Sequence, residues 1–135
     1  MYESKLNGST SWREHLKASE EFQIKVGDFL LKQWGVKLVE QEVPVRSAKK
    51  RFDFVSSANG GYVGDAKLFT YGGNPSSEKA GISEYVWLLQ NVDAKHKFMV
   101  FGGNRRTPED WLKRWRSLAN DIEFYFFEGE NLIRL

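Results

Sequence analysis

Cysteine is absent from the chain, and histidine occurs only twice, as His15 and His96. The missing thiols exclude a disulfide scaffold, a thiol nucleophile and a cysteine-ligated zinc site. Two histidines are too few for a histidine-rich metal centre, and we predict that both lie on the surface. No stretch approaches the roughly 18 apolar residues that a membrane helix needs. The first residues also lack the apolar run of a secretory signal, so we expect a cytoplasmic protein.

Repeats, low-complexity tracts and proline-rich linkers are also missing, and only three prolines occur in the 135 residues. Apolar residues make up 41% and charged residues 28% of the chain, a balance typical of a globular protein. A chain of this length buries enough surface to fold without a disulfide or a metal. We therefore expect a flexible tail over residues 1–10, followed by a single domain over residues 11–135.

Charge of one sign is not in large excess, since the formal net charge is +2. Basic residues are nevertheless concentrated in short stretches, namely Arg46, Lys49, Lys50 and Arg51, then Arg105 and Arg106. Local positive patches of this kind suit a phosphate-bearing partner such as nucleic acid. A solvated charged surface explains the same pattern, and charge alone favours that explanation.

The spacing of apolar residues and turn signals predicts the order α-β-β-β-α-β-α-β, with a further short strand at the end. A capping box at Ser11 and Glu14 starts the first helix, and Gly35 ends it. The later elements are expected at residues 36–45, 52–56 and 62–71 (strands), 82–91 (helix), 97–103 (strand), 107–120 (helix), and 122–127 and 131–135 (strands). Gly81 opposes an earlier start of the second helix. This order predicts an α/β fold with a mixed central sheet flanked by helices.

The third predicted helix begins with Thr107 as its cap and Pro108 in its first turn. Its sequence WLKRWR combines aromatic and basic residues, as nucleic-acid-binding segments do. Helical spacing, however, places Trp111, Trp115 and Leu118 on one face. We therefore predict that both tryptophans belong to the core.

The hairpin of the second and third predicted strands carries the residues that suggest chemistry, Asp53, Asp65 and Lys67. Residues two apart on a strand share a face, so Asp65 and Lys67 point the same way. An acid and a lysine are costly to bury on an otherwise apolar strand. Asp53 joins them only if it pairs directly with Asp65, which a three-residue loop over 58–60, or a bulge, would achieve. A two-residue turn would place Asp53 on the opposite face.

Two carboxylates that converge with a lysine suit a hydrolytic metal site. Carboxylate oxygens bind Mg²⁺ or Mn²⁺, which keep water ligands and accept a phosphate oxygen as a further ligand. Such a metal polarises the phosphate and lowers the pKa of a bound water. A neighbouring lysine orients that water or stabilises the developing charge. The hairpin therefore predicts the hydrolysis of a phosphate ester.

The spacing of Asp53 and of the tripeptide Asp65-Ala66-Lys67 resembles the signature of the PD-(D/E)XK nuclease superfamily, which includes restriction endonucleases and Holliday-junction resolvases. The predicted αβββαβ order over residues 19–101 is similar to that restriction endonuclease-like core, with a C-terminal helix and strand added. The resemblance implies that Asp53, Asp65 and the backbone carbonyl of Ala66 bind Mg²⁺ (or Mn²⁺). It also implies that Lys67 serves the attacking water. Phe52 stands where the signature has proline, a position that varies in the family. Two more tripeptides match D/E-x-K but lie on no paired strand, Glu3-Ser4-Lys5 and Asp93-Ala94-Lys95.

Many members of this superfamily also place a glutamate on the first helix, facing the site. Helical angles separate the two candidates, because Glu20 lies near the edge of the buried face and Glu21 points away from it. The resemblance therefore favours Glu20 as a fourth catalytic residue, with Gln23, deeper in the apolar face, as its substitute. A purely stabilising acid in the helix's first turn explains Glu20 equally well.

Together these features predict a nuclease, an endonuclease that acts on DNA rather than RNA, as a homodimer or in a larger complex. The predicted nucleic-acid contacts are Lys49, Lys50 and Arg51, in the loop before Asp53, together with Arg105 and Arg106. Three alternatives are open: an inactive nucleic-acid-binding or protein-interaction domain on the same fold, a toxin-like RNase, and an ordinary pair of surface acids on an unrelated α/β fold.

Overall fold

The computed structural model describes the backbone of residues 2–70 and 72–135 and the side chains of residues 12–70 and 72–135. Within these residues the chain forms three α-helices, six β-strands and two 3₁₀ turns. The helices are α1 (Tyr2–Trp34), α2 (Pro75–Gln90) and α3 (Arg106–Trp115). The strands are β1 (Val39–Val45), β2 (Ala48–Ser56), β3 (Tyr62–Phe69), β4 (His96–Gly103), β5 (Glu123–Glu128) and β6 (Asn131–Arg134). The 3₁₀ turns are η1 (Ala58–Gly60) and η2 (Arg116–Leu118). The predicted α/β class is therefore confirmed.

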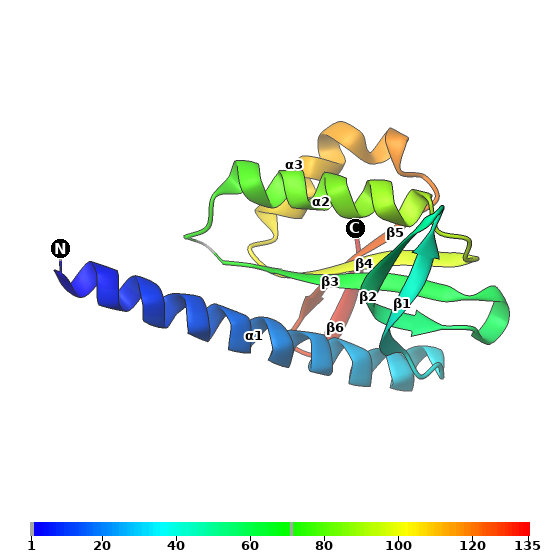
Figure 1. Cartoon of the computed structure of the whole chain (residues 1–135), viewed down its shortest axis with the longest axis horizontal. Coiled ribbons are helices and arrows are strands. Elements are labelled where there is room, and N and C mark those ends of the chain that lie inside the picture. The colour runs from blue at the N-terminus through cyan, green and yellow to red at the C-terminus, as the bar shows by residue number, and fades with distance from the viewer. Residues whose placement is uncertain (1, 71) are drawn as a thin grey trace.

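All six strands form one mixed sheet, in the order in which they follow along the chain (Figure 1). The pairs β1–β2 and β2–β3 are antiparallel, β3, β4 and β5 run parallel, and β6 is antiparallel to β5. Parallel neighbours need a crossover connection, which α2 and α3 supply. The sheet thus joins an antiparallel meander at one side to a parallel unit at the other.

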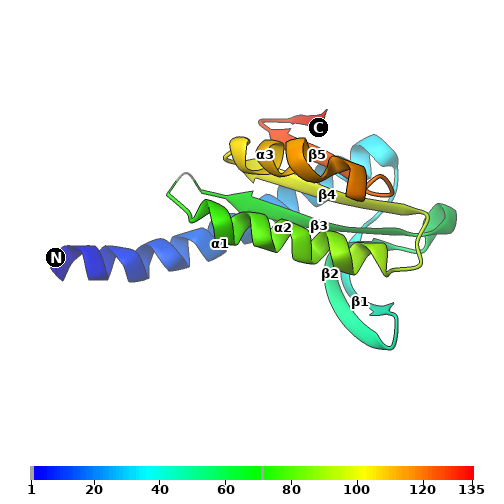
Figure 2. The same ribbon diagram turned by 90° about the horizontal axis from the view of Figure 1, so that it is seen from above.

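The sheet lies between two helical layers, with α1 on one face and α2 and α3 on the other (Figures 1 and 2). Leu30, Phe54 and Phe98 belong to the buried cluster on the α1 face. A larger cluster beneath α2 and α3 includes Phe52 and Phe101. Each of these side chains is at most 2% exposed, and burial of each stabilises the fold by about 1.5–3 kcal/mol. Both faces of the central strands are therefore covered, as their nearly continuous apolar sequence predicts.

α1 begins at Tyr2, well before the predicted start at Ser11. The predicted start is therefore wrong, and residues 2–10 of the expected tail are helical, while residue 1 lies outside the described residues. No proline occurs between residues 2 and 34 to interrupt it. The N-terminal part of α1 projects beyond the sheet (Figure 1). Among the helices described, none is long and apolar enough to cross a membrane.

α2 also begins earlier than predicted, at Pro75. Asn74 caps it, because its Oδ1 accepts hydrogen bonds from the amides of Ser76 and Ser77 at 3.0 and 3.2 Å. Pro75 occupies the first helical position, where a missing N–H has no cost. Gly81 therefore lies in the helix interior, where it costs about 1 kcal/mol relative to alanine without ending the helix.

α3 begins at Arg106, before the residue predicted to cap it, and Arg105 at the N-cap position makes no capping hydrogen bond with its side chain. The amide of Arg106 donates a hydrogen bond to Asn104 Oδ1 at 3.1 Å. Thr107 is instead buried, and its hydroxyl donates to Glu78 Oε1 at 3.3 Å. Thr107 thus joins α3 to α2 and does not begin the helix.

The two tryptophans of α3 have different environments. Trp111 is 4% exposed, so the prediction of a core tryptophan is confirmed at this position. Trp115 is 39% exposed, so the prediction is wrong at this position. Leu118, which the helical spacing places on the same face, is 65% exposed. The α-helix ends at Trp115, and the tighter turn η2 follows it. Because the 3₁₀ turn has a shorter period, the α-helical spacing no longer holds these side chains on one face.

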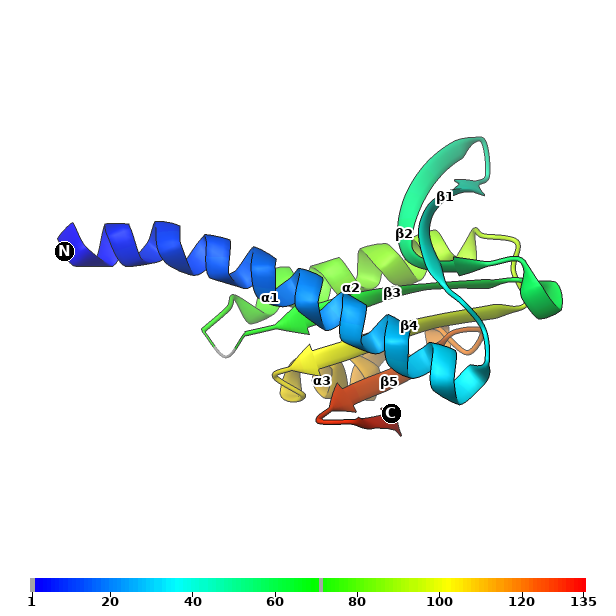
Figure 3. The same ribbon diagram turned by 90° about the horizontal axis from the view of Figure 1, so that it is seen from below.

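The hairpin of β1 and β2 extends away from the rest of the sheet (Figure 3). β2 begins at Ala48, before the predicted start at residue 52, and pairs with β1 along most of its length. Lys49, Lys50 and Arg51 therefore lie on a strand and not in a loop. The N-terminal half of β2 therefore contains three basic residues and leads directly to Asp53.

Candidate active site

The β2–β3 register places Asp53 opposite Asp65. The two strands pair through Phe54 with Gly64, Val55 with Val63 and Ser56 with Tyr62. The next position along this register places Asp53 directly opposite Asp65. The register predicted from a three-residue loop is therefore confirmed. The turn η1 occupies the residues expected to form the loop, with positive φ angles of 52° at Asn59 and 90° at Gly60.

A bulge bends β2 at the candidate site. Val39 of β1 pairs with Val55, while Gln41 pairs with Phe52, so Asp53 and Phe54 together face a single residue of β1. Bulges of this kind bend a strand and often re-aim side chains next to active sites. The pairing between β2 and β3 also ends at this point. The edge of β3 is therefore open along Ala66 and the residues after it.

The two aspartate side chains bridge the gap where the strand pairing ends. The amide of Asp53 donates a hydrogen bond to Asp65 Oδ1 at 3.2 Å. The amide of Ala66 donates in return to Asp53 Oδ2 at 2.9 Å. A hydrogen bond to a charged group stabilises a fold by about 1.5–3 kcal/mol. The two carboxylates therefore replace the backbone hydrogen bonds that β2 and β3 do not form here. These two hydrogen bonds hold the side chain of each aspartate against the backbone of the neighbouring strand.

Lys67 is fixed by an acid on one side and an aromatic ring on the other. Its Nζ lies 3.3 Å from Asp65 Oδ2 and 3.6 Å from the centre of the Tyr85 ring. The Nζ of Lys50 lies 5.4 Å from the same ring. Tyr85 comes from α2, so this helix positions the lysine from the opposite side of the cleft. Tyr85 was not predicted as a site residue, because only the tertiary fold brings α2 over β3.

The electrostatics of the cleft centre on Asp65, which is 3% exposed. Burial, and then the neighbouring carboxylate of Asp53, raise the pKa of Asp65 well above its usual value, and the ammonium of Lys67 offsets this only in part. Burial and the same two carboxylates raise the pKa of Tyr85 to about 12, so its hydroxyl is neutral at pH 7. The site therefore holds more negative charge than its surroundings stabilise.

A cleft of about 490 Å³ opens onto these residues between α1 and α2. Glu20 and Gln23 of α1 line it together with both aspartates and Lys67, so the two predicted helix residues lie at the site. His15 also lines this cleft, and its Nδ1 is buried with no hydrogen-bond partner among the described residues. His15 is thus half-buried and not a surface residue as predicted. His96 is half-buried as well, because its ring stacks on Tyr62.

The donor set of the cleft fits a hard divalent cation such as Mg²⁺ (or Mn²⁺). No group of three or more histidine or acidic side chains with metal-binding geometry occurs in the described part of the chain. Mg²⁺, however, is often held by one or two carboxylates, with water and substrate phosphates as its other ligands. The amide of Ala66 points towards Asp53, and the carbonyl of a strand residue points to the same edge as its amide. Two carboxylates and this carbonyl therefore face one gap, as the resemblance implies.

The remaining basic residues are spread over separate places. Arg105, just before α3, forms an ion pair with Glu109 at 3.2 Å, and Arg106 forms one with Asp110 at 3.7 Å. Neither arginine lines the cleft. On the hairpin, Arg51 pairs with Glu40 of β1 at 3.0 Å. Of the predicted phosphate contacts, the structure thus brings Lys50 close to the site, and it does not bring the arginines of α3 there.

Comparison with protein-family models, with curated proteins and with solved structures found no match to this chain.

Proposed function

We propose that this chain is a metal-dependent nuclease that hydrolyses phosphodiester bonds in nucleic acid, with DNA favoured over RNA and internal cleavage favoured over cleavage from an end. One observation carries the proposal. Asp53, Asp65 and Lys67 meet in a single cleft, at hydrogen-bond and ion-pair distances, although they come from two strands. Two charged side chains beside a deeply buried acid are expensive to assemble, and functional sites are where such arrangements concentrate.

The order of the elements supports the same proposal. A helix, three antiparallel strands, a helix and a strand parallel to the third follow one another from α1 to β4. The resemblance to PD-(D/E)XK nucleases predicts the same order, αβββαβ, for a restriction endonuclease-like core, and we include that core in the proposal. The acids also occupy the same elements as in that family, the second and third strands. The likeness supports a shared chemistry through the site residues, because a fold alone does not determine function.

The reaction is the addition of water to a phosphodiester. The water oxygen forms a bond to phosphorus, the ester P–O bond breaks, and the departing oxygen takes a proton. Asp53 and Asp65 would hold a divalent cation, and its charge would offset both carboxylates and polarise the phosphate. Lys67 donates hydrogen bonds to the attacking water or to the phosphate oxygens as negative charge develops. Tyr85 keeps the ammonium of Lys67 beside the site through the face of its ring.

The assisting residues come from the cleft walls. Glu20 lies across the cleft from the aspartates, where its carboxylate accepts a hydrogen bond from an incoming water. Lys50, on the strand that leads to Asp53, neutralises a phosphate next to the scissile one. Arg105 and Arg106 contribute little at this site, since acids of the same helix pair with both.

The first prediction concerns cleavage itself, and the chain offers an internal control. The tripeptide Asp-Ala-Lys occurs at residues 65–67 and again at 93–95, outside the cleft. Supercoiled plasmid, branched DNA, single-stranded DNA and total RNA are incubated with Mg²⁺, with Mn²⁺ or with EDTA. We expect metal-dependent cutting that Asp65→Asn and Lys67→Gln reduce by at least about a hundredfold. Asp93→Asn and Lys95→Gln leave the rate unchanged.

Each contrary result has a definite meaning. Binding of nucleic acid without cutting, in all metals, would indicate the inactive binding domain. Cutting of RNA alone would indicate the toxin-like RNase. Cutting that survives both substitutions at residues 65 and 67 would place the catalytic residues elsewhere and overturn the proposal.

A further inference from the structure

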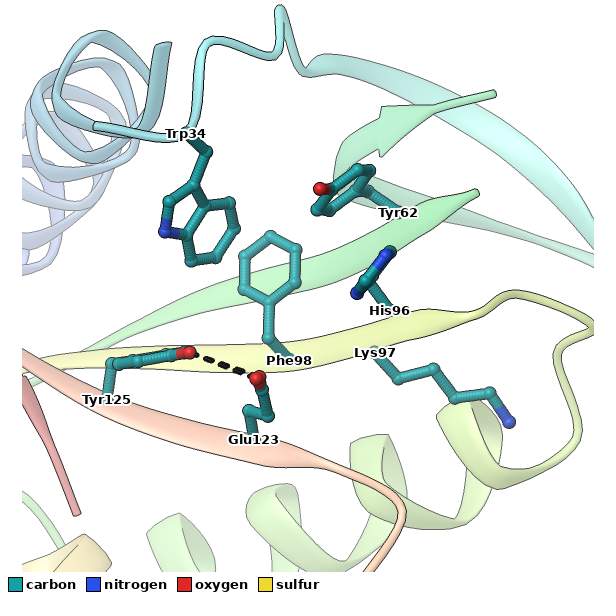
Figure 4. Close-up of a pocket in the computed structure, with 7 residues that line it drawn as sticks. All are labelled: Trp34, Tyr62, His96, Lys97, Phe98, Glu123 and Tyr125. Atoms are coloured by element: carbon teal, nitrogen blue, oxygen red, sulfur yellow. Dashed lines mark hydrogen bonds between the residues drawn. The ribbon is translucent and has the colours of Figure 1, made fainter. Parts of the chain in front are cut away.

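A second pocket, of about 290 Å³, lies at the amino ends of the three parallel strands (Figure 4). Tyr62, His96 and Glu123 are the first residues of β3, β4 and β5, and they reach it from the sheet. Trp34, the last residue of α1, closes the pocket from the helical layer. It shares no lining residue with the cleft of Asp53 and Asp65. This pocket is therefore a separate feature, which the proposed nuclease activity does not explain.

Aromatic rings form the walls of this pocket. Trp34 and Tyr62 are stacked, with ring centres 5.9 Å apart and an angle of 29° between their planes. Tyr62 in turn stacks on His96 at 4.3 Å and 16°. The rings of Phe98 and Tyr125 meet Trp34 at steep angles of 84° and 60°. Trp34, Tyr62, His96 and Tyr125 remain partly exposed, so ring surface is available to a ligand.

Polar groups stand at one edge of the rings. The hydroxyl of Tyr125 lies 3.2 Å from both carboxylate oxygens of Glu123 and donates to them, as the dashed line in Figure 4 marks. A carboxylate accepts about four hydrogen bonds, so Glu123 keeps capacity for donors from a ligand. The side chain of Lys97 lines the same pocket and pairs with Asp121 at 3.8 Å. The pocket thus offers flat apolar surface and an acceptor in one place.

An organic cation is disfavoured as the occupant, although aromatic pockets with an acid often bind one. The guanidinium of Arg134 already lies 5.4 Å from the centre of the Tyr125 ring and 3.6 Å from Glu123 Oε1. A second cation there would be repelled by Arg134 and by Lys97. The charge balance instead suits an uncharged flat ring with N–H donors along one edge.

We propose that this pocket binds a nucleobase, with guanine preferred. Bases stack on aromatic side chains through their π-faces, which Trp34 and Tyr62 can provide. Guanine carries two adjacent donors, N1–H and the N2 amino group, which match the two oxygens of a carboxylate such as Glu123. Adenine, cytosine and uracil lack this pair of adjacent donors. The inference is independent of catalysis, because it requires no residue of the Asp53–Asp65 cleft.

The experiment titrates the intact protein with GMP, AMP, CMP and UMP and follows the indole N–H signal of Trp34 by NMR. Ribose 5-phosphate serves as a ligand without a base, and choline as an organic cation. We expect GMP to shift the Trp34 signal at lower concentration than the other nucleotides, and ribose 5-phosphate to leave it unmoved. Glu123→Gln lowers the affinity for GMP by about tenfold and affects AMP less.

Two variants separate loss of binding from loss of folding. Trp34→Leu removes the stacking surface and weakens all nucleotides, by at least about tenfold. Because this variant lacks the Trp34 signal, its binding and that of the wild type are compared by isothermal titration calorimetry. Trp87→Leu, at an exposed tryptophan of α2 outside the pocket, is the matched control and leaves binding unchanged. Equal shifts with ribose 5-phosphate, tighter binding of choline, or GMP binding that survives both Trp34→Leu and Glu123→Gln would each overturn the inference. If cleavage is absent but GMP binds, only the proposed nuclease activity fails.

Discussion

Asp65 is the residue at which folding and the proposed chemistry meet. Its carboxylate accepts a hydrogen bond from the amide of Asp53 on the neighbouring strand, and it forms an ion pair with the ammonium of Lys67. Its side chain is almost completely buried, which stabilises the neutral form of the acid. The pKa of Asp65 is raised because burial and the Asp53 carboxylate disfavour its charged form. The charged form of Asp65 therefore lowers the stability of the folded protein.

The second prediction is a dependence of stability on pH that Asp65 causes. Because its pKa is higher in the folded than in the unfolded state, the folded state binds more protons at intermediate pH. The contribution of Asp65 is complete below the unfolded pKa of about 3.9, and it is lost as the pH rises through the folded value. Urea unfolding without divalent cations, from pH 4 to pH 8, is the measurement. We expect Asp65→Asn to flatten the decline in unfolding free energy that the wild type shows.

The control for this prediction is Asp93→Asn, which changes an exposed acid and keeps the wild-type pH profile. A decline of equal slope in wild type and Asp65→Asn would show that other groups cause it. A profile that rises over the whole range in wild type alone would mean that Lys67 dominates and that the pKa of Asp65 is lowered.

At the scale of single elements, β3 depends on a glycine that leaves room for an aromatic ring. A Cβ added at Gly64 would lie 2.4 Å from Cζ of Phe98, on the neighbouring strand β4. The Phe98 ring in turn stacks on Phe54 of β2 at 5.9 Å. One missing side chain therefore allows rings from the strands on both sides to meet over β3. This contact supports the paired part of β2 and β3 directly beside the aspartates.

The third prediction compares two glycine-to-alanine substitutions of opposite sign. Gly64→Ala forces the Phe98 ring to move within a buried cluster, which we expect to lower the unfolding free energy by about 1–3 kcal/mol. Gly81→Ala adds a methyl group in α2 where no atom lies within 4 Å. We expect this change to raise the unfolding free energy by up to about 1 kcal/mol, since alanine is the better helix former. Urea denaturation of both variants tests this, and equal effects would contradict it.

The sequence predicts the type and order of the elements better than their ends. Strong apolar patterns identify the strand at 97–103 and the hairpin of Asp53 and Asp65, because side-chain period follows directly from backbone geometry. The start of α2 is not predicted correctly, because Gly81 disfavours a longer helix by its low helix propensity. The cap at Asn74 nevertheless starts the helix at Pro75. At the site, the pairing of two acids follows from register alone. The bulge in β2 and the Tyr85 ring over Lys67 do not, since both depend on contacts between distant parts of the chain.

At the scale of the whole molecule, the formal net charge is only +2, and the basic side chains are divided between separate surfaces. Arg51, Arg105 and Arg106 pair with acids. Lys67 lines the cleft, and the Nζ of Lys50 lies 5.4 Å from the Tyr85 ring, with Lys49 next to it on the same strand. Affinity for a polyanion depends on the number of phosphates that cations neutralise. A single copy of this chain is therefore expected to hold nucleic acid through few phosphate contacts, near the site of cleavage.

The fourth prediction turns this charge distribution into a salt dependence. With about three phosphate contacts, the logarithm of the binding constant falls with the logarithm of salt concentration with a slope of about −3. Fluorescence anisotropy of a labelled DNA duplex, with the Asp65→Asn variant in EDTA, measures the slope without cleavage. Lys50→Ala reduces it by about one, and Lys113→Ala, on the exposed side of α3, leaves it unchanged. A slope steeper than about −6 would indicate that two copies bind together.

The hydrogen bonds between the aspartates and the strand amides constrain how this protein can change over time. In many enzymes a catalytic acid is a burden on stability, so a copy that no longer needs its activity is free to lose it. Here each acid also closes the gap between β2 and β3. A descendant that abandons cleavage would lose these strand contacts if either aspartate were replaced by a side chain that cannot accept a hydrogen bond. The aspartates of this fold are therefore expected to persist for their part in strand pairing, even in a descendant that has lost cleavage.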